Sequence, residues 1–360
     1  MVETCFIRTV LLMRKTIFPL LVFSLILVLT GCGRTGGQTQ PSSPAAGRVN
    51  TGSTSPQLSN SPGSLIIEPD YGSGPYLTVI YAAKHSIDVN SYLLTDHDLV
   101  NALIKQAEAG VNVRVIVAGN PYGDSQAVPQ ERAGFAGSRV LLKLAPAQFE
   151  GRYVYDHAKY LVTDPGQGGR AIPGSSNMDY SGLGGGNREY DYDTTDPAVV
   201  ANMEAIFDAD WNGQSLRLSQ PDPLIISPGS ESQLVSLIEG ASRRLDIESE
   251  EMGNDHPVLD AIIAAARRGV QVEVVLPAGV SEGNRRNAAE LSRAGAKVRY
   301  LGKPYPHAKL FVVDDQVFLG SQNISVSSLD RNREVGIVVT GDPVSEAATT
   351  FERDFAVAGE

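Results

Sequence analysis

Three patterns of hydrophobic and polar positions follow one another along the chain. The first is an apolar run, Thr16–Leu29, preceded by the positive charges of Arg14 and Lys15. This run is shorter than the roughly 20 residues that a membrane-spanning helix needs. It predicts the core of a signal peptide that covers residues 1–31. Residues 1–12 suit the start of such a peptide poorly, so the sequence leaves Met1 or Met13 as the initiator.

The second pattern is a polar stretch without hydrophobic periodicity. Between Gly33 and Gly63, 25 of 31 residues are Gly, Ser, Thr, Pro, Gln or Asn. Such a segment cannot bury enough apolar surface to fold by itself. Residues 32–63 are therefore expected to form a flexible linker, and folded structure is expected from residue 64 onward.

The third pattern occurs twice along the chain. Residues 65–67 recur as 224–226, and residues 99–119 parallel residues 258–279. In each copy, apolar residues at helical spacing lead to a glycine stop, and a strand rich in β-branched residues follows directly. This order predicts an α/β fold with parallel or mixed sheets.

The repeat divides the folded part into two domains, at residues 64–215 and 216–360. His157 and His307 occupy equivalent places 150 positions apart, which matches the length of one repeat. Two such halves are most simply packed face to face about a pseudo-twofold axis. Because one chain supplies both halves, a monomer is expected to suffice.

Composition and charge narrow the class of protein. The chain is 42% hydrophobic and carries a net charge of −11, which favours a globular protein and opposes a surface that coats nucleic acid. Removing residues 1–31 leaves 27 basic and 40 acidic residues, a net charge of −13. The only cysteines, Cys5 and Cys32, exclude a disulfide framework and a cysteine-based metal site.

The end of the apolar run, Leu29-Thr30-Gly31-Cys32, resembles the bacterial lipobox. That resemblance implies that Cys32 is acylated and becomes the mature N-terminus; the alternative is an ordinary secretory signal with a chance cysteine. Gly33 follows, so the aspartate that retains enteric lipoproteins in the inner membrane is absent. We expect a lipid-anchored protein on the extracytoplasmic side of a bacterial envelope, with the membrane layer undecided.

The two copies carry the same polar residues in the same order. They are His157, Lys159, Asp164, Ser175, Asn177 and Glu189 in the first copy, and His307, Lys309, Asp314, Ser321, Asn323 and Glu334 in the second. Within each strand, the histidine and the lysine two positions later face the same side. If the two strands meet across the twofold axis, two imidazoles, two ammonium groups and two amides surround one point.

This set of residues suits the cleavage of a phosphodiester. Lysine and asparagine side chains can stabilise the charge on the nonbridging oxygens. One imidazole can attack phosphorus, and the other can protonate the leaving alkoxide. Glu189 and Glu334 would each accept a hydrogen bond from one imidazole. The lysines supply the positive charge that a metal ion would bring, so no metal and no cofactor is expected.

His-x-Lys-x4-Asp followed by Gly-Ser-x-Asn and a later Glu is the signature of the phospholipase D superfamily, which the folded part therefore resembles. The resemblance implies a pair of αβαβα sandwich domains, a metal-independent reaction, His157 as nucleophile and His307 as general acid. From the residues alone, either histidine could be the nucleophile. Asp164 and Asp314 sit where the strand turns, and we expect them to be scaffold residues.

Some residues outside the two motifs also recur or are aromatic, and we expect structural roles for them. Asp96 and Asp255 precede helices, where aspartate is usually an N-cap. Tyr153, Tyr155 and Trp211 are expected in the core, with a lipid entrance as the alternative. The acidic run 248–251 is expected to be a solvated loop, and a loop at 182–186 that is rich in glycine to form a mobile rim.

The leading expectation for activity is a phospholipase D that hydrolyses phospholipids to phosphatidic acid and headgroup, with possible transfer to an alcohol. A first alternative is an extracytoplasmic endonuclease, although Arg188, Arg331 and Arg333 are the only basic residues in the motif loops. A second is a transferase like cardiolipin synthase, whose members generally carry membrane helices. A non-catalytic binding lipoprotein would predict erosion of one motif, and neither motif is eroded.

Overall fold

The computed structural model describes residues 63–218, 223–253, 256–279 and 281–359, all within one compact unit, Ala45–Glu360. The predicted signal peptide, Cys32, nearly all of the linker and Asp255 lie outside the described residues.

The first sheet contains seven strands in one path, with the order β1-β7-β6-β5-β2-β3-β4. Strands β2, β3 and β4 are parallel to one another, and the remaining neighbours are antiparallel. The strands are β1 (Gly63–Glu68), β2 (Ser86–Ser91), β3 (Asn112–Val117), β4 (Leu141–Leu144), β5 (Tyr160–Thr163), β6 (Arg170–Pro173) and β7 (Asn187–Thr194).

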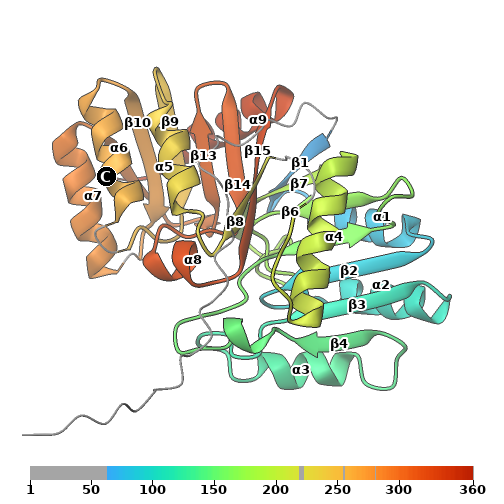
Figure 1. Ribbon diagram of the computed structural model, residues 1–360. Helices are drawn as coiled ribbons and strands as arrows, with labels where there is room; N and C mark the ends of the chain where they lie inside the picture. Colours follow the sequence, from blue (N-terminus) through green and yellow to red (C-terminus); the bar gives the residue numbers. More distant parts are fainter. Residues whose placement is uncertain (1–62, 219–222, 254–255, 280, 360) are drawn as a thin grey trace, which may run out of the picture. The chain divides into compact units, whose positions relative to one another are not determined.

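The second sheet repeats this order as β8-β15-β14-β13-β9-β10-β11, with the same parallel and antiparallel neighbours. Its strands are β8 (Leu224–Ser227), β9 (Arg244–Ser249), β10 (Gln271–Pro277), β11 (Lys297–Leu301), β13 (Lys309–Val313), β14 (Gln316–Gly320) and β15 (Glu334–Thr340). The identical order confirms the predicted α/β class and the pseudo-twofold pair of halves (Figure 1).

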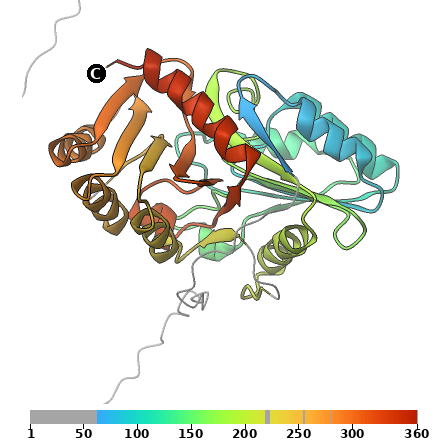
Figure 2. The ribbon, with the colours of Figure 1, turned by 90° about the horizontal axis from the view of Figure 1, so that it is seen from above.

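Helices cover both sheets. On the outer flanks lie α1 (Gly74–Ala82) and α2 (His97–Glu108) against the first sheet, and α5 (Glu231–Glu239), α6 (Pro257–Arg267) and α7 (Glu282–Ala294) against the second (Figure 2). The longest described helices, α4 (Pro197–Asn212) and α9 (Asp342–Val357), contribute to the core that both halves share. Shorter helices are α3 (Ala127–Gly134), α8 (Val326–Asp330) and a 3₁₀ turn at Ala147–Phe149.

The shared core explains why the halves form one unit. It joins Tyr160 and Tyr190 of the first sheet to Leu310 and Val335 of the second, all essentially without solvent exposure. Burial of large apolar side chains contributes about 1.5–3 kcal/mol for each. Neither sheet could expose this face without losing that contribution.

The helix starts differ between the halves. Asp96 is the N-cap of α2, and its carboxylate accepts the backbone N–H of Leu99. Helix α6 instead begins after His256, whose Nδ1 accepts the N–H of Val258. The expectation that Asp255 caps this helix is wrong, because Pro257 occupies the first helical position and makes His256 the capping residue.

Two further expectations are tested by the packing. Trp211 stacks on Phe207 at the edge of the shared core, with ring centroids 5.6 Å apart, whereas Tyr153 is exposed. The acidic run 248–251 is not a solvated loop. Glu248 is buried within β9, and Glu250 reaches charged side chains of the second motif. In the described part of the chain, no helix is long and apolar enough to cross a membrane.

Candidate active site

The segment that precedes each motif histidine pairs with the opposite half. His157 donates its backbone N–H to the carbonyl of Arg333, and Arg333 donates its own to the carbonyl of Tyr155. In the second copy, the short strand β12 (Tyr305–Pro306) pairs in parallel with the start of β7, opposite Asn187 and Arg188. Each half therefore inserts its histidine segment beside the Asn-Arg-Glu sequence of the other.

This exchange pairs each histidine with the glutamate of the other half. His157 Nδ1 lies 2.9 Å from Glu334 Oε2, and His307 Nδ1 lies 2.6 Å from Glu189 Oε1. Both glutamates are fully buried, while the two imidazoles retain 12% and 11% exposure. A carboxylate at Nδ1 leaves Nε2 as the nitrogen available for chemistry.

Each glutamate is itself held by two polar side chains. Glu189 accepts hydrogen bonds from the Ser175 hydroxyl, at 2.7 Å, and from the Asn187 amide, at 3.1 Å. Glu334 accepts from the Ser328 hydroxyl, at 2.6 Å, and from the Asn332 amide, at 3.0 Å.

Ser321, the expected equivalent of Ser175, does not contact the glutamate. Its hydroxyl instead exchanges hydrogen bonds with the backbone of Val335. Ser328 takes over because α8, which has no counterpart in the first copy, brings it against Glu334. Asn187 and Asn332 are supporting residues that the recurring Asn-Arg-Glu sequence could have indicated.

The two lysines are buried and lie close to the histidines. Lys159 Nζ donates to the carbonyl of His157, at 2.5 Å, and Lys309 Nζ donates to the carbonyl of His307, at 2.6 Å. Burial lowers the pKa of Lys159 to about 7, and the charge of Lys309 acts in the same direction. Groups from both halves thus influence one another electrostatically, as expected for a single site.

The motif asparagines offer hydrogen-bonding atoms that the protein leaves unused. Asn177 Oδ1 and Asn323 Oδ1 are buried, and neither has a hydrogen-bond partner in the described part of the chain. Buried polar atoms are seldom left unsatisfied. These two oxygens, like Oε1 of the neighbouring Gln322, are acceptors that lack a donor among the described residues.

Asp164 and Asp314 lie at the far end of their hairpins. Asp164 accepts the backbone N–H groups of Lys84, His85 and Ser86, all within 2.8 Å. Asp314 does the same for residues 242–244. These contacts fasten each hairpin to the segment that enters β2 or β9, and so hold the strand that carries the histidine and lysine.

Besides the serine that holds the glutamate, one position beside the histidines differs between the two halves of the site. The residue directly after β2 is Tyr92, whose ring lies 4.8 Å from the His157 ring and 5.0 Å from Lys159 Nζ. The residue directly after β9 is Glu250, whose Oε2 lies 2.9 Å from Lys309 Nζ and 3.3 Å from His307 Nε2. Sequence reasoning missed both residues, although their shared place in the repeat marks them as equivalent.

Two of the three arginines of the motif loops, Arg188 and Arg333, are held by buried carboxylates of the opposite half. Arg188 forms a buried ion pair with Asp354 of α9, and Arg333 forms one with Asp210 of α4. Each pair again joins one half to the other. These guanidinium groups are occupied by structural partners, so they are not available to hold phosphates.

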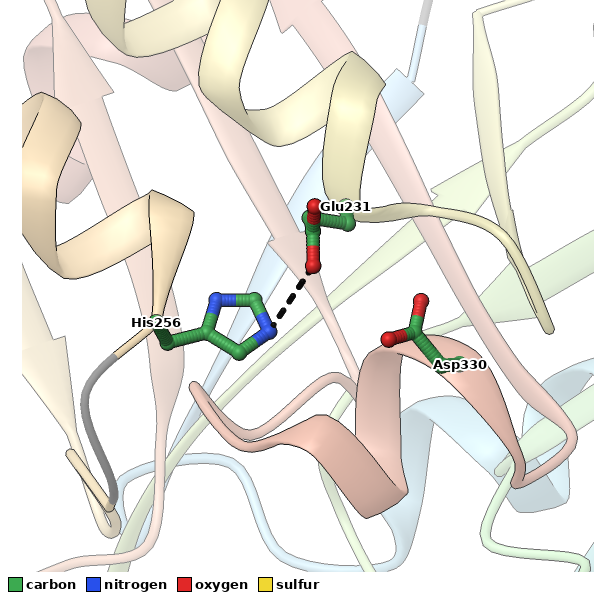
Figure 3. Close-up of side chains that lie close together, drawn as sticks. All are labelled: Glu231, His256 and Asp330. Carbon is green, nitrogen blue, oxygen red and sulfur yellow. Dashed lines mark ion pairs between the residues drawn. The ribbon is translucent and has the colours of Figure 1, made fainter.

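A second cluster of ionisable side chains consists of Glu231, His256 and Asp330 (Figure 3). His256 Nδ1 accepts the N–H of Val258, so that nitrogen is unprotonated and the proton resides on Nε2, 3.1 Å from Glu231. Metal coordination requires a lone pair on Nε2, which this tautomer does not have. The arrangement supports a hydrogen-bonded cap of α6.

Comparison with known proteins identifies the family. The model of the family described as "Cardiolipin synthase, PLD-like domain" matches residues 76–211 and 234–356, one segment in each half. The chain belongs to the phospholipase D superfamily. The matched segments of this superfamily member contain all eight of the histidine, lysine, asparagine and glutamate residues described above.

Among its relatives is the major cardiolipin synthase ClsA of Bacillus subtilis, with 26% identity over 330 residues that cover 78% of this chain. The chain spans 66% of the length of that relative. Among solved structures, phosphatidylserine synthase from Haemophilus influenzae has a TM-score of 0.62 at 13% identity, covering 83% of this chain and 88% of the other. Polyphosphate kinase from Porphyromonas gingivalis also gives 0.62, at 14% identity, covering 81% and 50%. These two likenesses concern the fold.

Proposed function

We propose that this phospholipase D superfamily member is a phosphatidyltransferase that moves a phosphatidyl group from one phospholipid to a hydroxyl group of another. The observation that carries this proposal is the single site in which His157 and His307 are each held by the glutamate of the opposite half. The relatives named as cardiolipin synthases support transfer over the hydrolysis that the sequence had favoured.

In the first step, His157 Nε2 attacks phosphorus and forms a P–N bond while the bond from phosphorus to the headgroup oxygen breaks. His307 gives its Nε2 proton to the departing oxygen. In the second step, His307 takes the proton of the acceptor hydroxyl, whose oxygen forms a new P–O bond as the P–N bond breaks. Water as acceptor gives phosphatidic acid.

The environment of His157 supports its role as nucleophile. Burial lowers the pKa of His157, against the opposing effect of Glu334, and so favours the neutral imidazole that attack requires. Lys159, Lys309, Asn177 and Asn323 would donate to the nonbridging phosphate oxygens, which makes a divalent metal unnecessary for this charge.

Exposed tyrosines near the site support a lipid substrate. Tyr122 is 75% exposed and donates its backbone N–H to the hydroxyl of Tyr92, and Tyr305, two residues before His307, is 41% exposed. Tyrosine rings are suited to the boundary between lipid and water. Acylation of Cys32 would hold the enzyme at an envelope membrane from the extracytoplasmic side.

The test uses the full chain with phosphatidylglycerol vesicles in the presence of EDTA. Transfer predicts cardiolipin and free glycerol in equal amounts, and neither product with His157→Ala or His307→Ala. Phosphatidic acid alone would establish a hydrolase instead. Nicking of plasmid DNA without lipid turnover would overturn the proposal in favour of the nuclease alternative.

A further inference from the structure

The pseudo-symmetry of the site is broken at one position beside the reacting groups. The paired histidines, lysines, asparagines and glutamates are identical in the two halves, whereas Tyr92 beside His157 is matched by Glu250 beside His307. This position contacts the imidazoles directly, so it is a source of chemical difference between the two histidines.

The contacts of Glu250 place a negative charge at the reactive nitrogen of His307. Oε2 lies 3.3 Å from His307 Nε2 and 2.9 Å from Lys309 Nζ, and the side chain is 27% exposed. Although burial opposes ionisation, His307 and Lys309 hold the pKa of Glu250 well below its ordinary value, so it is a carboxylate. No hydrogen bond between described residues involves its other oxygen.

The two ring nitrogens of His307 lie near carboxylates in different ways. Nδ1 lies 2.6 Å from Glu189 Oε1 without the geometry of a hydrogen bond, and Nε2 lies 3.3 Å from Glu250 Oε2. A carboxylate beside Nε2 favours a proton on that nitrogen. On the other side, Nε2 of His157 has no ion pair with any described carboxylate, and the Tyr92 ring packs against that imidazole.

We propose that Glu250 is a positioning residue that keeps a proton on Nε2 of His307 and thereby fixes His307 as the acid on the leaving-group side. This inference rests on the proposed phosphotransfer at the same site. At 3.3 Å the contact to Nε2 is long, so the proton can pass to a substrate oxygen once one is present. The proton lost to the leaving oxygen returns from the acceptor hydroxyl in the second step.

Other charged groups around His307 remain in place when Glu250 is changed. They are Glu189 on β7, Lys309 on β13, and Asp179 in the connection between β6 and β7, whose pKa is influenced by His307. Lys159 belongs to the same electrostatic cluster through Glu189 and Glu250. A Glu250 variant removes the negative charge beside both His307 and Lys309, so the comparison of two leaving groups is needed to assign its effect to the acid.

The experiment measures kcat/KM against pH for the full chain, with a phenyl and a p-nitrophenyl ester of the same phosphodiester. For Glu250→Gln with the phenyl ester, we expect the fall of kcat/KM on the alkaline side of the profile (the alkaline limb) to occur at a pH lower by about one unit or more. The p-nitrophenyl ester needs little protonation of its leaving group, so we expect its rate to change far less. Glu250→Tyr, which copies the first half, should behave like Glu250→Gln.

Glu239→Gln is the control, because it removes an exposed carboxylate on α5, outside the site, and should keep the wild-type limb. An unchanged limb in both Glu250 variants would overturn the inference, and so would an equal loss with both esters at every pH. These simple esters separate this test from that of the proposed function. If phospholipids are not turned over but the esters are, the lipid substrate is wrong while the role of Glu250 is still decided.

Discussion

At the scale of single residues, the twofold symmetry of the site is only approximate. His157 and His307 have the same kind of partner on Nδ1 and different neighbours elsewhere. The motif residues themselves could be predicted from sequence, because spacing fixed their order and the repeat matched them in pairs. Glu250 and Ser328 could not, because their contacts depend on where β9 ends and on how α8 packs.

Loss of either histidine should abolish turnover. We expect His157→Ala and His307→Ala to lower kcat by at least about 10³-fold, since each removes a group that takes part in bond making or proton transfer. Circular dichroism and thermal unfolding should show a retained fold. His97→Ala changes an exposed histidine outside the site and serves as the control. Full activity in either single variant of the site would contradict the mechanism with two histidines.

Removal of one supporting carboxylate should have a smaller effect. Glu334→Gln leaves the shape of the side chain but not the charge that faces His157 Nδ1. We expect kcat to fall by about 10–100-fold, less than the roughly 10²–10⁴-fold that a general acid or base contributes, because Glu334 orients His157 and does not itself transfer the proton. Because Glu334 belongs to the second half, this loss at His157 would also demonstrate the exchange between halves. A variant with wild-type kcat would argue against it.

At the scale of elements, the exchange of partners joins strands and helices that are distant in sequence. The repeated pattern predicted α/β units with parallel or mixed sheets in two halves, whereas the order of strands in each sheet and the pairing of β12 with β7 were not predicted. A two-residue strand has too little pattern to be seen in a sequence. The ion-pair partners of Arg188 and Arg333 lie on α9 and α4 and could likewise not be predicted from the sequence.

The buried pair of Arg333 and Asp210 should contribute strongly to stability. Arg333→Met leaves Asp210 uncompensated in the interior, and we expect the free energy of unfolding to fall by about 3–5 kcal/mol. Adding Asp210→Leu should restore much of it, because an apolar pair of similar size carries no buried charge. Urea denaturation measures both.

Arg331→Met, an exposed change two positions away, should shift the free energy of unfolding by less than about 0.5 kcal/mol. An additive loss in the double variant would show that the ion pair is not coupled as described.

At the scale of the whole molecule, several aspartate and glutamate side chains are buried without a positively charged partner for each. Burial raises the pKa of Glu248 to about 8, and those of Asp191 and Glu131 to about 7. In the unfolded chain these groups titrate near 4. Between these values the folded state binds more protons, so the free energy of unfolding must fall as pH rises.

We therefore expect stability to decline from about pH 5 to pH 7.5 in urea denaturation. The lowered pKa values of His157 and Lys159 act in the opposite direction, but they concern two protons against the three of these acids. Glu248→Gln should make the decline shallower, because it removes the acid with the largest of these three values. Stability that rises across this window would contradict the assignment of these acids as protonated.

In the proposed reaction, one site built from both halves forms a covalent bond between His157 and phosphorus. The most direct measurement treats the full-length His307→Ala variant with a phosphatidyl ester of p-nitrophenol, whose departure needs no acid. The variant should release p-nitrophenol once, and mass spectrometry should find an acid-labile phosphatidyl group on the peptide that contains His157. An adduct on another residue, or steady turnover without an adduct, would contradict the account.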